Sequence, residues 1–241
     1  MGYHFDFGHV TGPGAVRDRN EDAYSFDLAE MIWVVADGMG GKSRGDLASR
    51  IAAMVVKNKA AEDADLVSAI QAGNAAIKLA GQRYDGAGMA TTIVALLIDR
   101  DINYELAWVG DSRAYLWQDG ELKALTRDHS FVQELLDAGV LTTEEAETHP
   151  QRNVVTRSLG NREDHKPDVD SVQGRLVAGN RILLCTDGLT SELDDEEINR
   201  QLSSGDSAQR TAESLMQKAL DSGGKDNITV LIIDIVDKGA R

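Results

Sequence analysis

Apolar residues along the chain follow two spacings, one typical of strands and one typical of helices. Short runs that are apolar throughout or alternate with polar residues predict strands. These lie at Tyr3–Val10, Ala23–Asp27, Met31–Ala36, Thr91–Ile98, Tyr104–Val109, Arg113–Trp117, Glu121–Leu125, Asp168–Leu176, Arg181–Thr186 and Ile228–Val236. The run Thr91–Ile98 is nearly all apolar, which predicts a strand covered on both faces.

Longer segments repeat their apolar residues every three to four positions, which predicts helices. The segment Gly45–Ala61 carries an apolar set that should lie on one face: Leu47, Ile51, Met54 and Val55. Leu66–Arg83 repeats this spacing with Leu66, Ile70, Ile77 and Ala80. Further helices are expected at Ser130–Ala138, at Thr143–Thr148 behind a capping box, from Asp194 onward, and at Ala208–Leu220.

The order of these elements indicates the fold class. Strands come in groups with short connections, such as the Asp119-Gly120 turn, and helices come in consecutive pairs. This order predicts an α+β fold with a central β-sandwich of two antiparallel sheets flanked by pairs of helices, rather than a parallel sheet. We expect residues 1–241 to form a single domain.

Charge and composition narrow the function. The chain has a net charge of −15, which argues against a nucleic-acid partner because phosphate backbones attract clusters of Lys and Arg. Cys185 is the only cysteine, so no disulfide forms within the chain. The N-terminal residues lack the pattern of a signal peptide, and no apolar run has the length of a membrane span. We therefore expect a cytoplasmic protein with no membrane partner.

Four aspartates adjoin predicted buried strands. Asp37, Asp111 and Asp187 follow strands, and Asp226 precedes the last one. A single Asp of this kind is most often a turn residue, but several converging carboxylates repel one another unless a cation neutralises them. Oxygen ligands favour Mg²⁺ or Mn²⁺. Two such ions about 3.5–4 Å apart can share a water and direct it in line at a phosphorus.

The N-terminal segment adds the opposite charge. Arg17 lies four residues before Glu21 and five before Asp22. A guanidinium group matches phosphate with two parallel hydrogen bonds, and the two acids could accept hydrogen bonds from water molecules on a metal ion. The segment therefore predicts a phosphate contact beside the aspartates.

Seven stretches together carry a family resemblance. They are Val16–Asp22, Val35–Gly41, Gly110–Arg113, Leu125–Ser130, His149–Asn153, Cys185–Leu189 and Gly224–Thr229. In this order, and over nearly the whole chain, they resemble the metal-dependent protein phosphatase (PPM, type 2C) family in its compact bacterial form. The resemblance implies a protein serine/threonine phosphatase with two Mn²⁺ or Mg²⁺ ions and a possible third. A metal-activated water would attack the phosphorus in line, without a phosphoenzyme intermediate.

The resemblance also implies a role for each motif residue. Asp37 would bridge the two metal ions, the Gly38 carbonyl would complete one of them, and Asp187 and Asp226 would hold the other. Asp111, with Asp187, would hold the third ion. Arg17 would bind the substrate phosphate, and Glu21 and Asp22 would act through metal-bound water. A flap is expected at about residues 129–160.

Three expectations remain more open. The position two residues after the bridging aspartate is Met39, where eukaryotic members of the family have a histidine that is proposed to protonate the leaving oxygen. A water on the metal, or alternatively His129, would take that role here. Phosphorylated proteins, including a bacterial Ser/Thr kinase and its substrates, are the expected partners, and the chain is expected to be a monomer.

Two rival interpretations belong to other classes. Residues 36–43 fit a loose form of the phosphate-binding loop of nucleotide-binding proteins, although Ala36 stands where the stricter form has glycine. The antiparallel strand order argues against that fold. A catalytically silent binding module of the same fold is the other rival, and metal-dependent hydrolysis of a phosphoester would exclude it.

Overall fold

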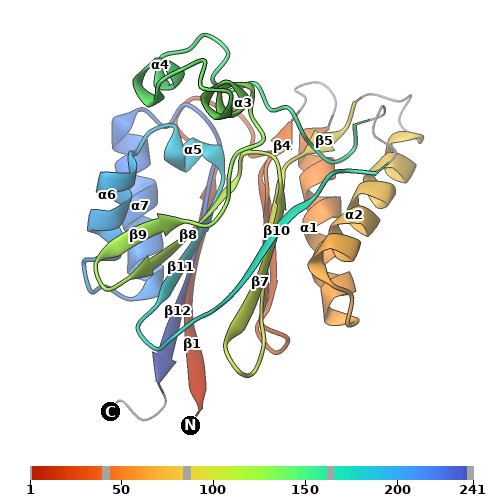
Figure 1. Cartoon of the computed structure of the whole chain (residues 1–241). Coiled ribbons are helices and arrows are strands. Elements are labelled where there is room, and N and C mark those ends of the chain that lie inside the picture. The colour runs from red at the N-terminus through yellow and green to blue at the C-terminus, as the bar shows by residue number, and fades with distance from the viewer. Residues whose placement is uncertain (1, 40–43, 84–87, 162–165, 238–241) are drawn as a thin grey trace.

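The chain folds into four layers, with two β-sheets inside and helices outside (Figure 1). The computed structural model describes residues 2–39, 44–83, 88–161 and 166–237. Both large sheets are antiparallel and five-stranded. The predicted α+β sandwich is therefore confirmed.

The first sheet has the order β1-β12-β11-β8-β9. Its strands are β1 (Tyr3–Gly12), β8 (Arg113–Gln118), β9 (Glu121–Ala124), β11 (Arg181–Cys185) and β12 (Ile228–Asp237). The helices α5 (Asp187–Thr190), α6 (Asp195–Leu202) and α7 (Ala208–Ser222) follow β11 in the chain. Buried residues of α6 and α7, such as Ile198 and Leu215, pack with Leu183 and Val230 of the sheet in one apolar cluster.

The second sheet has the order β10-β7-β6-β3-β2. Its strands are β2 (Ala23–Asp27), β3 (Ile32–Ala36), β6 (Ile93–Ile98), β7 (Asn103–Val109) and β10 (Asp170–Arg175). The helices α1 (Gly45–Ala61) and α2 (Leu66–Gly81) cover its outer face. The predicted buried face of α2 is confirmed at Leu66, Ile70 and Ile77.

The predicted apolar face of α1 is wrong in part. Met54 is 54% exposed, and the face that is completely buried carries Ala48, Ala52 and Val56. The small side chains let α1 lie close to both α2 and the sheet, because Gly73 of α2 faces Val56 at short range. The spacing of the large apolar residues therefore indicated the face of α1 next to the one that is actually buried.

The core between the two sheets consists of large side chains from both. Trp33, Leu96 and Leu106 of the second sheet pack with Leu184 and Ile233 of the first, all of them without solvent exposure. Burying a side chain of this size contributes roughly 1.5–3 kcal/mol. The two sheets are thus held face to face, which fixes the relative positions of their ends.

The segments that carry the predicted site residues lie at one end of this sandwich. In the second sheet β3 and β7 both pair antiparallel with β6, so the two strands run in the same direction and end at the same edge. In the first sheet the end of β11 lies beside the start of β12. Two short strands at this end, β4 (Gly38–Met39) and β5 (Ala90–Thr91), were not predicted, and neither was α5.

The segment after β9 lies over the same end (Figure 1). It contains α3 (Phe131–Asp137) and α4 (Thr143–Glu147), and the predicted capping box of α4 is present. Isolated β-bridges join Thr91 to Leu159 and Ser130 to Val155. Among the described residues, no helix has the length and apolar character needed to cross a membrane.

Candidate metal centre

Asp37 and Asp111 follow β3 and β7, and both are fixed to the start of β6. The backbone N–H of Asp37 donates to Thr92 Oγ1 at 3.0 Å, and its carbonyl accepts from the Thr91 hydroxyl at 2.7 Å. The residue before Asp111 is Gly110, with φ 110°, and a Cβ there would lie 2.6 Å from the Thr92 side chain. The backbones that carry both aspartates are therefore held rigidly.

Gly38 lies at a close crossing of two backbone segments. Its N–H donates to the Glu21 carbonyl at 3.2 Å. A Cβ on Gly38 would lie 2.3 Å from the carbonyl oxygen of Gly45, at the start of α1. Glycine is required here because no side chain fits between the two backbones. The crossing brings Glu21 and the N-terminus of α1 beside the Asp37-Gly38 turn.

Asp187 and Asp226 meet where β11 ends and β12 begins. Asp187 is the first residue of α5, and Asp226 stands two residues before β12. A Cβ on Gly188 would lie 2.0 Å from the Asn227 carbonyl oxygen, so these two segments touch through their backbones. The four predicted aspartates are thus brought to one end of the sandwich by two sheets.

The carboxylates at this end influence one another strongly. Burial, followed by the charges of Asp22, Asp187 and Asp111, holds the pKa of Asp37 well above its usual range. Burial and the Asp187 charge do the same to the pKa of Asp111. The pKa of Asp187 is raised by burial and by the charge of Asp226. Converging buried acids with raised pKa values are typical of functional sites, because their repulsion destabilises the charged forms.

Asp22 is the most completely buried of the acids from the N-terminal segment. It is 7% exposed, and its Oδ2 accepts hydrogen bonds from the Thr186 and Thr229 hydroxyls at 2.9 and 2.7 Å. Burial raises the pKa of Asp22 to about 7, although these two hydrogen bonds oppose the shift. The other oxygen, Oδ1, is buried and has no hydrogen-bond partner among the described residues.

A divalent cation fits this arrangement. Oδ1 of Asp187, like Oδ1 of Asp22, is buried with no partner in the described part of the chain. Buried carboxylate oxygens without donors are costly, and the surrounding groups are other carboxylates. Among the described residues, no three His, Cys, Asp or Glu side chains are grouped closely enough to hold a metal ion by themselves. Mg²⁺ and Mn²⁺ also take carbonyl oxygens and several waters as ligands, so a centre for these ions does not depend on such a group.

Arg17 contacts the centre at its exposed side. Its Nη2 donates to Asp226 Oδ2 at 2.7 Å, and the two side chains are 57% and 38% exposed. Glu21 lies nearer to α1, where burial and then the charge of Asp46 raise its pKa. All three predicted residues of the N-terminal segment therefore border the aspartates, although Arg17 pairs with one of them.

Asn227 is a residue of the centre that sequence analysis quoted without a role. Its Oδ1 accepts the Glu21 N–H at 2.8 Å, and its Nδ2 donates to the carbonyls of Arg19 and Pro13 at 2.8 and 3.2 Å. One buried amide thus ties the segment that carries Arg17 to the start of β12. Its position directly after a candidate ligand, at a strand start, was the available signal.

His129 is anchored next to Asp111. Its Nδ1 accepts the Gly110 N–H at 3.1 Å, so the ring proton is on Nε2, which lies 3.3 Å from Asp170 Oδ2. Burial lowers the pKa of His129. Both ring nitrogens are occupied by protein groups, so the alternative in which His129 protonates the leaving oxygen gains no support from this geometry.

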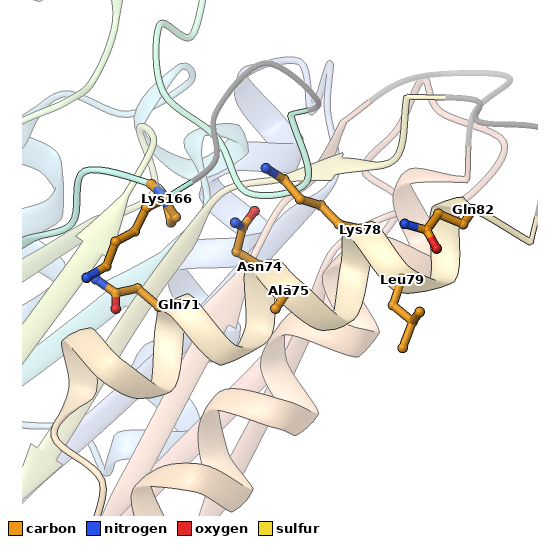
Figure 2. A pocket seen from close by; sticks show the side chains of 8 residues that line it. Gln71, Asn74, Ala75, Lys78, Leu79, Gln82 and Lys166 are labelled. Carbon is orange, nitrogen blue, oxygen red and sulfur yellow. The ribbon is translucent and has the colours of Figure 1, made fainter.

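A groove of about 400 Å³ lies elsewhere, on the outer side of α2 (Figure 2). Gln71, Asn74 and Lys78 of that helix line it together with Lys166 and Pro167. Asn74 Oδ1 accepts the Gly160 N–H at 2.8 Å, so the groove lies close to where Gly160 contacts α2. None of the candidate metal ligands lines it, and the buried acids define the functional site better than this hollow does.

A sandwich of two sheets with helices outside and a cluster of buried acids at one end is the arrangement of a protein suited to divalent cations. The family model for Protein phosphatase 2C matches residues 15–223. The chain belongs to this family, and the predicted family is confirmed. The part of the nucleotide-loop interpretation that falls on residues 40–43 lies outside the described residues. β3 pairs antiparallel on both sides, which contradicts that interpretation.

The chain matches nearly the whole length of one relative and less than half the length of another. The serine/threonine phosphatase stp of Listeria monocytogenes is 37% identical over 95% of this chain and 96% of its own length. The serine/threonine protein phosphatase PstP of Mycobacterium tuberculosis is 40% identical over 93% of this chain, which spans 44% of PstP. A solved structure of the PstP catalytic domain, in complex with two manganese ions, superposes with a TM-score of 0.84 at 34% identity, covering 98% of this chain and all of that one.

Proposed function

We propose that this chain is a metal-dependent protein serine/threonine phosphatase that hydrolyses phosphoserine and phosphothreonine. The observation that carries the proposal is the set of buried carboxylates beside an arginine, with two oxygens, on Asp22 and Asp187, that have no donor among the described residues. Family membership and the PstP structure with two manganese ions support the same function.

The proposed metal ligands divide between the two sheets. Asp37 would bridge two Mn²⁺ or Mg²⁺ ions, and the Gly38 carbonyl would complete one of them. Asp187 and Asp226 would hold the other, and Asp111 with Asp187 would hold a third. Ions bound there would supply Lewis-acid stabilisation and a water of lowered pKa for in-line attack on phosphorus, with no phosphoenzyme intermediate. The raised pKa values of Asp37, Asp111 and Asp187 support the assignment, because a cation offsets the burial and the mutual repulsion that raise them.

Arg17 is the proposed contact for the substrate phosphate. Its guanidinium group neutralises Asp226 in the structure. We infer that Arg17 would leave Asp226 when that carboxylate holds a cation and would then make two hydrogen bonds to phosphate oxygens. Glu21 and Asp22 would accept hydrogen bonds from waters on the metal and so orient those waters. Such a water would supply the proton for the leaving oxygen.

The wider setting of the enzyme is part of the proposal. Phosphorylated proteins are the substrates, and a bacterial Ser/Thr kinase and its targets are among them. The chain acts as a cytoplasmic monomer, residues 1–241 form one domain, and residues 129–160 act as a flap beside the metal centre. The position of α3 and α4 over that end of the sandwich supports the flap (Figure 1).

A hydrolysis assay tests the function. The purified chain should hydrolyse a phosphothreonine peptide with Mn²⁺ and lose activity with EDTA. Asp187→Asn should lower kcat/KM by at least about 100-fold, because metal stabilisation of the transition state contributes several kcal/mol. The matched control is Asp99→Asn, in an exposed turn after β6. The side-chain oxygen of an asparagine there can still accept the two backbone N–H groups that donate to Asp99. A wild-type chain that binds Mn²⁺ and turns over no phosphoester would favour a silent binding module.

A further inference from the structure

A row of threonine hydroxyls crosses the first sheet next to the metal centre. Thr11 of β1 and Thr229 of β12 are direct register partners, and Thr186 follows β11 beside them. Thr186 and Thr229 have no solvent exposure, and Thr229 stands inside a strand that is otherwise apolar along its buried part. A buried hydroxyl is costly without a partner, so its partners indicate its use.

Hydrogen-bond directions in this row follow from the donors available. The Thr186 oxygen accepts the Thr229 N–H at 3.0 Å, which leaves its own proton for Asp22 Oδ2. Thr229 also donates to Oδ2, so its oxygen receives the proton of Thr11 at 2.8 Å. Thr11 in turn accepts from Asn20 Nδ2 at 2.8 Å. Two hydroxyl protons of the row are therefore donated to one oxygen of Asp22, and the Thr11 proton is donated to Thr229 behind them.

Thr186 shows that this arrangement differs from ordinary helix capping. It holds the N-cap position of α5, where a threonine side chain normally accepts a backbone N–H of the first turn. Its side chain makes no such capping bond. The hydroxyl is turned to Asp22 instead, so the local stability of α5 does not explain its placement.

We propose that Thr186 and Thr229 are positioning residues of the metal centre, which hold Asp22 so that Oδ1 accepts from a water of the metal shell. With Oδ2 fixed by two hydroxyls, the carboxylate cannot rotate about its last side-chain bond. The acids whose charges interact with Asp22 are Asp37, Asp187 and Asp226, and an ionised carboxylate has no proton to donate to Oδ1. A hydrated cation supplies the missing donor. This inference rests on the proposed metal-dependent function.

Mn²⁺ affinity of the metal-stripped full chain tests the inference by calorimetry, with no substrate present. Thr229→Val and Thr186→Val keep the side-chain shape and remove one hydroxyl each. Each should raise the Kd for Mn²⁺ by about 10-fold, the lower range for partners that orient a metal site. Thr229→Ser should restore the wild-type Kd within about twofold, since it returns the hydroxyl. At saturating Mn²⁺ the valine variants should lower kcat and leave KM for a phosphothreonine peptide unchanged.

Thr211→Val is the matched control. Thr211 is equally buried, and its hydroxyl oxygen accepts from Arg181 at the other end of β11. It should bind Mn²⁺ as the wild type does. If Thr229→Val fails to fold, Thr186→Val and Thr229→Ser decide. Wild-type affinity in the valine variants, or equal weakening in Thr229→Ser and Thr229→Val, would overturn the positioning role. A wild-type chain without Mn²⁺ binding would instead overturn the proposed function beneath it.

Discussion

Two charged residues with the same exposure, Asp22 and Arg181, lie at opposite ends of the first sheet. They differ in how completely their hydrogen-bonding groups are paired. Each is 7% exposed. Arg181 uses all five of its donors. Its partners are both oxygens of Asp234, the Leu202 and Asp206 carbonyls and the Thr211 hydroxyl. Asp22 leaves one buried oxygen without a donor in the described chain.

The difference separates a structural site from a functional one. A buried charge that is fully paired holds a fold together, and losing its partner is costly. A buried charge with an open oxygen among other acids destabilises the protein by itself and calls for a ligand. Exposure alone does not distinguish the two ends, and the list of hydrogen-bond partners does.

The largest expected effect comes from removing Arg181, the buried charge whose donors are all paired. Arg181→Met leaves Asp234, whose side chain is 16% exposed, without its partner. It also leaves the other acceptors of Arg181 without that donor, so the free energy of unfolding should fall by about 3 kcal/mol. Urea unfolding of the metal-free protein measures this. Arg200→Met is the control, because Arg200 pairs with Glu196 on the surface of α6 and such pairs contribute at most about 1 kcal/mol. A similar small loss in both variants would contradict the account of this end.

The sequence predicted the acids better than it predicted their supports. Asp37, Asp111 and Asp187 adjoin apolar strands, a pattern visible within ten residues. The threonine and asparagine contacts to the 13–22 segment join residues about 160 to 220 positions apart, and no local pattern reveals the strand register that brings them together. The polar Thr229 inside an apolar run was the one available sign.

The fold was predictable for a similar reason. Long strands and helices have periodic patterns that local sequence carries. The strands β4 and β5 have two residues each, and the helix α5 has four, which is too short for a period. They form because of contacts between distant segments, at the backbone crossing beside Gly38 and at the end of β11. These short elements carry Gly38 and Asp187, so tertiary contacts decide the details of the site.

Gly38→Ala sharpens the comparison at the acidic end. Its Cβ would meet backbone atoms of Gly45 and Glu21 at 2.3 to 2.5 Å, and backbone yields less readily than a side chain. We expect a loss of about 1–3 kcal/mol in unfolding free energy, together with weaker Mn²⁺ binding in calorimetry. Gly88→Ala is the control, since nothing lies within 4 Å of its Cβ. Unchanged Mn²⁺ binding in Gly38→Ala would argue against the proposed carbonyl ligand.

The pH dependence of stability should also differ between the ends. The pKa of Asp22 is about 7 in the folded chain and near the usual 3.8 when unfolded. Between these values the folded state holds a proton that the unfolded state has released, so stability falls as pH rises. Asp22 alone should lower the stability of the metal-free protein by on the order of 2 kcal/mol between pH 5 and pH 7. Asp37, Asp111 and Asp187, whose pKa values are also raised, should add to this loss. Urea unfolding at both pH values measures this.

Asp22→Asn provides the check on that slope. An asparagine does not titrate, so the variant should lose on the order of 2 kcal/mol less stability than the wild type over the same pH interval. Asp37, Asp111 and Asp187, whose pKa values are also raised, account for the remaining loss of stability. Arg181→Met should keep the wild-type slope, since its site does not include the raised acids. A wild-type protein that gains stability between pH 5 and pH 7 would contradict the assignment.

The smallest expected effect concerns Asn227, whose side-chain amide is fully hydrogen-bonded and lies beside the buried acids. Asn227→Ala removes three hydrogen bonds to the segment that carries Arg17. We expect KM for a phosphothreonine peptide to rise about 10-fold, equivalent to about 1.4 kcal/mol. Asn103→Ala is the control and should leave KM unchanged, because Asn103 lies at the exposed start of β7, where its side chain donates to Asp99. Equal KM values in the two variants would show that the segment holds its position without Asn227.

Mn²⁺ binding to the metal-stripped chain tests the central claim most directly, namely that the buried acids form a metal centre. Calorimetric titrations should compare the wild type with Asp187→Asn and Arg181→Met at pH 7. The account predicts at least two bound ions in the wild type and in Arg181→Met, and the loss of at least one in Asp187→Asn. No binding in the wild type, or the same isotherm in Asp187→Asn, would contradict it.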